Sequence, residues 1–315
     1  MSSTVGFDVG GTKIAGGVVD EGGRIVAETR RESPAEHVDA ITDAIAGIVE
    51  EFRHDHDVIA VGVAAAGFLD RDRDRIMFAP NLAWRDEPLR RLVHDRVGLP
   101  TVMENDANAA AWAEHRFGAG RDARTLALVT CGTGIGGGLV IDGRLFRGGF
   151  GVGAEFGHMR VVPDGRQCNC GLRGCWEAYG SGTGLTVRAR ELAAEDPSSA
   201  GLLLGLAGGD PAAINGPMVT EAAEKGDPAA RQSFAELAHW LGEGMASLSA
   251  ILDPDVIVVG GGVAESPELD LEVVRRAFDG AETGFGHRPQ PAIRLAELGN
   301  RAGLIGAADL ARLQA

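Results

Sequence analysis

The sequence predicts a mixed α/β protein built as two lobes of related architecture. Three observations support this fold class. Short apolar strands alternate along the chain with helix-period segments. A strand, a glycine-rich turn and a second strand follow one another twice, in residues 1–30 and again in residues 125–141. The length of 315 residues, 44% of them hydrophobic, is sufficient for two modest cores. We expect each lobe to present its glycine turn to a shared central cleft.

The first lobe begins with a predicted meander of three strands, at residues 5–8, 14–19 and 24–29, separated by the turns GGTK and DEGG. Apolar residues from Val38 to Phe52 fall on one helical face, which predicts a helix there. The run VIAVGVA at 58–64 predicts a buried strand. An alanine-rich helix is expected over 104–117.

The second lobe repeats the strand, turn and strand plan with TLALVTC at 125–131 and GGLVI at 137–141. A helix is expected over 183–195. A Gly/Pro/Ser-rich connection at 196–217 is expected to be a surface excursion. A long helix over 228–252, a buried strand at 255–259 and a terminal helix over about 303–313 complete the chain.

Charge and composition exclude several function classes. Thirty basic and 45 acidic residues give a net charge of −15, which repels nucleic-acid phosphates and anionic membranes. The amino-terminal residues MSSTVGFDVG lack the basic and apolar regions of a signal peptide. No window approaches the roughly 18 apolar residues of a membrane span. We therefore expect a cytoplasmic protein without nucleic-acid or membrane partners.

Three glycine clusters follow predicted strands. DVGGTK at 8–13 places a carboxylate, a tight turn, a hydroxyl and an ammonium group together, although an ordinary hairpin turn is the alternative. TCGTGIGGG at 130–138 has more glycines than the β-bulge alternative needs. VIVVGGG at 256–262 ends a strand where open α/β sheets bind ligands. The spacing differs from a Walker loop. Together the clusters predict a nucleotide site.

The most specific local pattern is a histidine followed by three cysteines: His158, Cys168, Cys170 and Cys175. Three thiolates and an imidazole complete a closed tetrahedral Zn²⁺ site, so the metal would be structural. The alternative is a loop of reduced cysteines beside an unrelated histidine. Zinc would also hold Glu177, two residues past the last ligand, in a defined place. Cys131, inside an apolar strand, is expected to be a buried hydrophobe.

The segment ENDANAAAW contains the candidate catalytic base, Asp106. A sugar hydroxyl that attacks a phosphoryl group needs a positioned carboxylate to accept its proton. The alternative is a helix cap or first-turn charge. Asn81, Asn105, Glu155 and Glu177 lie beside glycines or turns, as expected of hydrogen-bond partners of sugar hydroxyls, although each alone fits a surface residue.

These motifs resemble the ROK family of sugar kinases and repressors over nearly the whole chain. FDVGGTK is similar to the family's first phosphate turn, GTGIGGG to its second, ENDANAAA to its catalytic segment, and EFGH with CNCGLRGCWE to its zinc segment. The segments FAPNLAWRDEPL, HRFGAG and AGLIGAADLARL look in particular like the glucokinases of this family from actinobacteria.

The resemblance implies two RNase H-like α/β lobes, as in actin and hexokinase. A small lobe at 1–117 would be completed by a helix at about 300–315, and a large lobe at 118–299 would carry a zinc loop at 158–175. It implies phosphorylation of glucose at its 6-hydroxyl, with MgATP as the donor and Asp106 as the base. The implied sugar ligands are Gly67, Asn81, Asn105, Asp106, Glu155, His158 and Glu177. The implied ligands of the nucleotide and its Mg²⁺ are Asp8, Gly10, Gly11, Thr12, Lys13, Thr133, Gly134, Gly261 and Gly262.

Several alternatives stay open at this point. The sugar could be another hexose, N-acetylmannosamine or N-acetylglucosamine, and polyphosphate could replace ATP, although polyphosphate-using relatives generally lack the Cys-rich segment. The family suggests a homodimer or a homotetramer. Its repressors carry a winged helix-turn-helix ahead of the first phosphate turn. Because seven residues precede Asp8 here, we expect a kinase rather than a sugar-sensing regulator.

Overall fold

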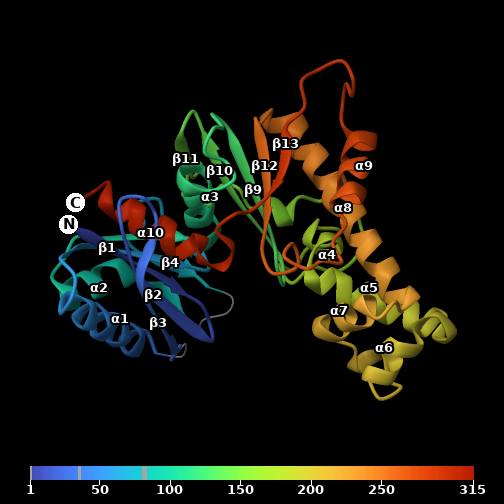
Figure 1. Ribbon diagram of the computed structural model, residues 1–315, viewed down its shortest axis with the longest axis horizontal. Coiled ribbons are helices and arrows are strands. Elements are labelled where there is room, and N and C mark those ends of the chain that lie inside the picture. The colour runs from blue at the N-terminus through green and yellow to red at the C-terminus, as the bar shows by residue number, and fades with distance from the viewer. Residues whose placement is uncertain (1, 35–36, 80–83) are drawn as a thin grey trace. The chain divides into compact units, whose positions relative to one another are not determined.

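The computed structural model describes residues 2–34, 37–79 and 84–315 (Figure 1). Internal contacts divide the chain into two compact units. The first comprises Met1–Leu128, Gly137–Ala154 and Ala296–Ala315, and the second comprises Val129–Gly136 and Glu155–Leu295. The lobes expected from the sequence, at 1–117 with the C-terminal helix and at 118–299, stay a prediction.

The first unit is built on a five-stranded sheet with the order β3-β2-β1-β4-β8. The strands are β1 (Ser3–Val9), β2 (Lys13–Val19), β3 (Ile25–Glu32), β4 (Val58–Ala65) and β8 (Thr101–Asn105). Strands β1, β2 and β3 form an antiparallel meander, whereas β4 and β8 run parallel to β1. The strands β5 (Phe68–Leu69), β6 (Ile76–Phe78) and β7 (Arg85–Glu87) form a separate small sheet in the same unit.

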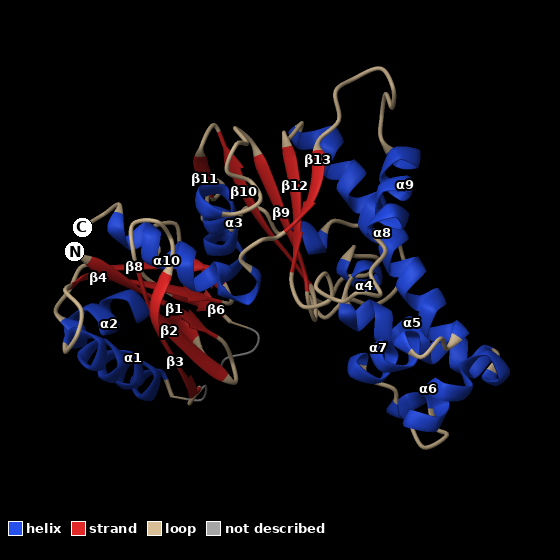
Figure 2. Ribbon diagram, in the orientation of Figure 1, coloured by secondary structure: helices blue, strands red, loops and turns tan. Residues whose placement is uncertain are grey.

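Helices cover both faces of the five-stranded sheet (Figure 2). The first face packs against α1 (Val38–Arg53) and α2 (Leu89–Val97) around Phe7 and Ile45. The other packs against α3 (Asp106–Phe117) and α10 (Ala302–Arg312). Helix α10 approaches β4 so closely that a Cβ on Gly62 would lie 1.9 Å from the carbonyl oxygen of Ala307. The end of the chain is therefore an integral part of the first unit.

The helix expected over 104–117 begins two residues later than predicted, at Asp106. Glu104 and Asn105 are instead the last residues of β8. The amide oxygen of Asn105 accepts a hydrogen bond from the backbone N–H of Asn108 at 3.1 Å, which makes Asn105 the N-cap. The composition of the segment does not show where the helix begins. The start is set by the capping hydrogen bond of Asn105.

The second sheet repeats the strand order of the first, as β11-β10-β9-β12-β13. Its strands are β11 (Arg144–Phe146), β10 (Ile135–Ile141), β9 (Leu126–Cys131), β12 (Val256–Gly260) and β13 (Ala292–Leu295). The outer pair β10 and β11 is antiparallel, and β12 and β13 are parallel, as in the corresponding strands of the first sheet. The recurrence seen in the sequence thus continues through the whole sheet.

The second unit contains β12, β13 and the helices that follow the cysteine-rich loop. The helices are α4 (Glu177–Gly180), α5 (Gly182–Glu195), α6 (Gly201–Leu206), α7 (Gly216–Glu224), α8 (Pro228–Leu252) and α9 (Leu271–Ala281). The connection expected at 196–217 is not a plain loop, since α6 and the start of α7 lie within it. Asp196 and Asn215 cap the helical turns there. Asp and Asn are common both in loops and at helix caps, so the sequence alone suggests a loop. Across the described residues, no helix is both long and apolar enough to cross a membrane.

Candidate active site and metal centre

Two carboxylates meet in the first unit, at the end of β1 and the start of α3. Burial, and then the charge of Asp106, raise the pKa of Asp8 to about 6. Burial also raises the pKa of Asp106, although the Ala107 N–H donates to its carboxylate at 2.9 Å and opposes the shift. Gly303 of α10 lies beside both residues, since a Cβ there would be 3.8 Å from each. Such perturbed acids are typical of functional sites.

Asn105 is oriented at both ends of its side-chain amide. Its oxygen caps α3, and its Nδ2 donates to the carbonyl oxygen of Gly67 at 3.3 Å. Gly67 has a φ of 140°, and a Cβ there would lie 2.7 Å from the carbonyl oxygen of Phe78. Gly67 and Asn105 thus lie together, next to Asp106. Asn81, a predicted sugar ligand, lies outside the described residues.

The first glycine turn, residues 10–13, is a hairpin between β1 and β2. Strand pairing continues to Val9 and Ile14, and the Gly10 N–H donates to the carbonyl oxygen of Lys13 at 3.0 Å. Thr12 and Lys13 are exposed at its tip. The backbone of this turn is therefore a hairpin with Asp8 at its base, and phosphate binding by the turn stays a prediction.

Residues 130–136 of the second glycine cluster and the third cluster lie side by side in the second unit. A Cβ on Gly261, where φ is 90°, would be 2.5 Å from the carbonyl oxygen of Cys131, and the Val263 N–H donates to that oxygen at 3.0 Å. The start of α5 holds the second turn, because both the N–H and the hydroxyl of Thr183 donate to the carbonyl oxygen of Thr133. Segments far apart in the sequence therefore build one backbone-lined wall.

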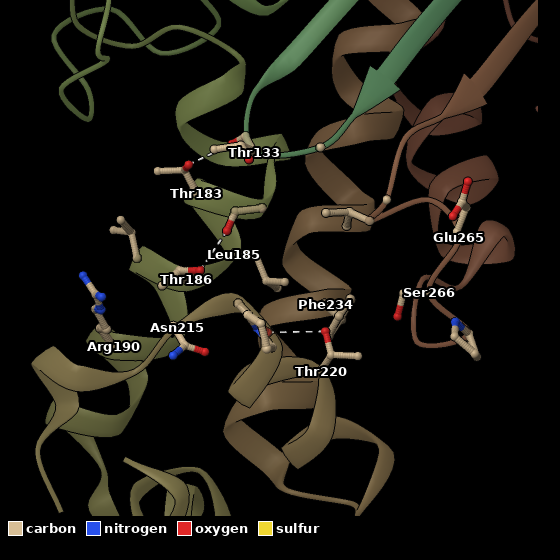
Figure 3. A pocket seen from close by; sticks show the side chains of 18 residues that line it. Thr133, Thr183, Leu185, Thr186, Arg190, Asn215, Thr220, Phe234, Glu265 and Ser266 are labelled. Atoms are coloured by element: carbon tan, nitrogen blue, oxygen red, sulfur yellow. Dashed lines mark hydrogen bonds between the residues drawn. The ribbon is translucent and has the colours of Figure 1, made fainter. Parts of the chain in front are cut away.

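A cavity of about 880 Å³ opens beside this wall, within the second unit (Figure 3). Apolar side chains such as Leu185, Phe234 and Val263 form much of its lining. Polar groups come from three further segments: Thr183, Thr186, Arg190, Asn215, Thr220, Glu265 and Ser266. A largely apolar cavity with a few polar groups is typical of small-molecule sites. Sequence reasoning found Thr133 and Gly262 but missed these other residues.

His158, Cys168, Cys170 and Cys175 come together as predicted, with their ligand atoms all within 4.8 Å of one another. The sulfurs of Cys170 and Cys175 are 3.6 Å apart, and the Cys168 sulfur is 3.8 Å from His158 Nδ1. Zn–S bonds of about 2.3 Å in a tetrahedron place sulfurs about 3.8 Å apart. The four residues therefore fit a tetrahedral metal ion. Cys131 is fully buried in β9, where burial raises the pKa of its thiol to about 12.

Glu177 lies between this cluster and the second glycine cluster, residues 130–138. Its Oε1 is 2.9 Å from the Cys168 sulfur, and a Cβ on Gly134 would lie 2.6 Å from its Oε2. Glu155 begins the short 3₁₀ turn that ends at His158, whose N–H donates to the Glu155 carbonyl oxygen. The second unit thus carries His158 in the His/Cys cluster and Glu155 and Glu177 next to it in the chain or in space. The first unit carries Gly67, Asn105 and Asp106.

The repeated β3-β2-β1-β4-β8 plan, the glycine turns and the paired aspartates define the class of RNase H-like α/β phosphotransferases. The ROK family model matches residues 4–314. The chain belongs to the ROK family, and its actin- and hexokinase-like fold class is confirmed.

Similar proteins of this family include sugar kinases of more than one specificity. The chain is 49% identical to a glucokinase of Streptomyces coelicolor, covering 99% of this chain and 98% of that protein. It is 33% identical to an N-acetylmannosamine kinase of Salmonella typhi, covering 98% of each. The crystal structure of a ROK family glucokinase from Streptomyces griseus in complex with glucose and AMPPNP has a TM-score of 0.87 and 50% identity, covering 99% of both chains.

Proposed function

We propose that the protein is an ATP-dependent glucokinase, which transfers the γ-phosphoryl group of MgATP to the 6-hydroxyl of glucose. The observation that carries the proposal is the placement of Asp106. It lies at the start of α3, beside an oriented Asn105 and a second carboxylate, and its pKa is raised as a general base requires. The similarity to glucokinases over the full chain supports the choice of sugar.

In the proposed reaction Asp106 accepts the proton of the 6-hydroxyl while that oxygen forms a bond to the γ-phosphorus. The bond between the γ-phosphorus and the β,γ-bridging oxygen breaks, and ADP leaves with the electron pair. Bound Mg²⁺ would neutralise phosphate charge, and Asp8 is the carboxylate suited to hold it, directly or through water. Burial raises the pKa of Asp8, so a cation partner would favour its charged form.

We assign sugar recognition to Gly67, Asn81, Asn105, Glu155, His158 and Glu177, which offer acceptors and donors for several hydroxyls. The adenosine moiety is assigned to the cavity of the second unit, whose size suits it. Its phosphates would contact the backbone at Thr133, Gly134, Gly261 and Gly262, and the turn from Gly10 to Lys13.

The metal of the His/Cys cluster is proposed to be a structural Zn²⁺. All four positions are protein ligands, so no site is left open for substrate. Its role would be to fix His158 and Glu177. We further propose that the protein acts in the cytoplasm as a homodimer or a homotetramer.

A coupled assay over a panel of sugars tests the proposal. With MgATP, we expect a kcat/KM for glucose at least about tenfold above those for mannose, N-acetylglucosamine and N-acetylmannosamine. Preference for N-acetylmannosamine would favour the second candidate, which the similarity to the Salmonella typhi kinase supports. Polyphosphate in place of ATP tests the donor. If no sugar stimulates ATP turnover, the kinase proposal fails and a sugar-sensing role replaces it.

A further inference from the structure

Glu104 is a buried carboxylate that neither the proposed reaction nor sugar binding uses. It is 2% exposed and directly precedes Asn105 and Asp106 at the end of β8. Its Oε1 accepts hydrogen bonds from the Asn105 backbone N–H at 3.2 Å and from Nδ2 of Asn108 at 3.3 Å. One oxygen of Glu104 is thus committed to the first turn of the helix that carries Asp106.

The other oxygen is committed to Arg147. Both Nε and Nη2 of Arg147 lie 2.7 Å from Oε2 of Glu104. A second guanidinium, that of Arg73, approaches the same oxygen only to 3.9 Å. Because charge-assisted hydrogen bonds at this distance are strong and the carboxylate is shielded from water, Arg147 is the main compensation for the buried charge.

Arg147 begins the segment 147–154, which leads from β11 to Glu155. The segment meets the loop that follows β5 at a second point within the first unit, since a Cβ on Gly151 would lie 3.0 Å from the carbonyl oxygen of Asp70. The Gly153 N–H also donates to the Arg147 carbonyl oxygen at 2.9 Å, which closes the segment on itself. The ion pair therefore joins the strand that ends at the catalytic residues to the segment that leads to a proposed sugar ligand.

We propose that Arg147 and Glu104 are positioning residues: the pair fixes the Asn105–Asp106 backbone and the segment 147–154 relative to each other within the first unit. The inference rests on the proposed function, because positioning is defined by the sugar and Asp106. Neither side chain reaches the cavity assigned to adenosine. The pair should consequently affect kcat and the KM for sugar, and leave the KM for ATP unchanged.

The test compares Arg147→Met, Arg147→Lys and the double variant Glu104→Gln/Arg147→Met. The control is Arg124→Met, which breaks an exposed ion pair with Asp142 in the same unit. Arg147→Met should raise the KM for glucose about tenfold and lower kcat about tenfold, a scale expected for misplaced groups, with the KM for ATP within about twofold. It should also lower stability, since it leaves Glu104 uncompensated. Arg147→Lys, which keeps the charge but loses the two-point contact, should fold and show an intermediate effect.

The double variant separates positioning from stability. Its Glu104→Gln change removes the buried charge, so thermal stability should recover, whereas the raised KM for glucose and the lowered kcat should persist. Recovery of stability and kinetics together would overturn the proposal, and so would unchanged sugar kinetics in both single variants.

Hydrogen exchange gives a readout that does not depend on turnover. The Asn105 amide should exchange faster in Arg147→Met and Arg147→Lys than in wild type and in Arg124→Met, and equal exchange would contradict the proposal. Wild-type turnover with glucose is measured first, so that failure of the proposed function is distinguished from failure of the positioning role.

Discussion

At the scale of single residues, Asp106 shows how burial decides between two interpretations of one carboxylate. An aspartate in the first turn of a helix is ordinarily explained by capping or by the helix dipole. Here Asn105 is the cap, and burial raises the pKa of Asp106 against the hydrogen bond from Ala107. A buried carboxylate that is not needed as the cap is consistent with the catalytic role proposed for Asp106.

Asp106→Asn should therefore lower kcat by roughly 100-fold or more, the usual scale for a positioned general base. The dissociation constant for glucose should change little, because asparagine keeps the size of the side chain and one oxygen that can accept a hydrogen bond from the sugar hydroxyl. Single-turnover kinetics and calorimetric titration with glucose measure the two effects. Near-normal turnover would remove Asp106 from the proposed mechanism.

Asp8 predicts a trade-off between stability and function that depends on pH. Its pKa rises from 3.8 to about 6 on folding, so the native state disfavours the charged form. The penalty is absent below pH 3.8, grows as pH rises and is complete above about 6. The full shift corresponds to roughly 3 kcal/mol, and partial solvent access of the side chain reduces the expected value to roughly 2 kcal/mol.

In protein free of nucleotide and Mg²⁺, Asp8→Asn should thus raise the free energy of unfolding by roughly 2 kcal/mol at about pH 7.5 and much less near pH 4. Urea denaturation at the two pH values measures this difference. The same variant should lose MgATP-dependent turnover. An equal change in stability at both pH values would show that the buried charge is not the cause.

The candidate site residues that the sequence predicts are those whose chemistry is local. The three cysteines lie within eight residues, and Asp106 follows Asn105 in a recognisable segment. In contrast, Thr186, Asn215 and Glu265 line the cavity from three segments with no shared motif. Only packing of α5, α7 and the residues after β12 brings them together, and no local pattern records that packing.

At the scale of elements, we expect the cysteine-rich loop to depend on its His/Cys cluster. Backbone bonds such as Cys168 N–H to Leu172 and Trp176 N–H to Met159 hold it, but the loop has few buried apolar side chains. A metal that joins His158 to three cysteines would supply the missing stabilisation and carry Glu177 with it.

Cys170→Ser should release the metal and raise the KM for glucose by roughly tenfold or more, since the loop that carries Glu177 loosens. Mass spectrometry of metal content and steady-state kinetics measure the two effects. Cys131→Ala is the control. Cys131 lies in β9 and is not one of the four clustered residues, so this variant should retain the metal. Fully active wild-type protein without bound zinc would refute the structural role.

The boundaries of a helix are predictable where its hydrophobic periodicity extends over many residues. They are much less predictable where a single capping residue sets the start of the helix. Helix α8 spans residues 228–252 as expected. Helix α3 starts two residues late because Asn105 caps it, and α6 escapes prediction because its six residues contain two glycines. Propensity over a window cannot resolve such short or capped elements.

At the scale of the whole molecule, the repeated sheet is predictable only in its first strands. The sequence recurrence covers the turns and the strands beside them, whereas β8 and β13 join their sheets from residues far along the chain. Parallel edge strands need long connections, which carry no local signal of their pairing.

One buried carboxylate links α3 to the segment by which the chain returns to the sheet of the first unit. Glu114 of α3 is fully buried and accepts the backbone N–H groups of Ala119 at 2.8 Å, Leu298 at 2.8 Å and Glu297 at 3.2 Å. It thereby joins α3 to the segment that leads into α10. Burial without such partners would be costly, so the carboxylate and the three amides stabilise one another.

Glu114→Ala would leave those three N–H groups without their acceptor, at a cost of about 1–3 kcal/mol for each group that water does not reach. We expect a total loss of about 3 kcal/mol, measured by urea denaturation, with faster hydrogen exchange in α10. Glu114→Gln, which retains one carbonyl acceptor, should lose about half as much. Because α10 packs against β1, β4 and α3, the loosened return segment should destabilise the first unit as a whole. Unchanged exchange in α10 of Glu114→Ala would show instead that packing alone anchors the end of the chain.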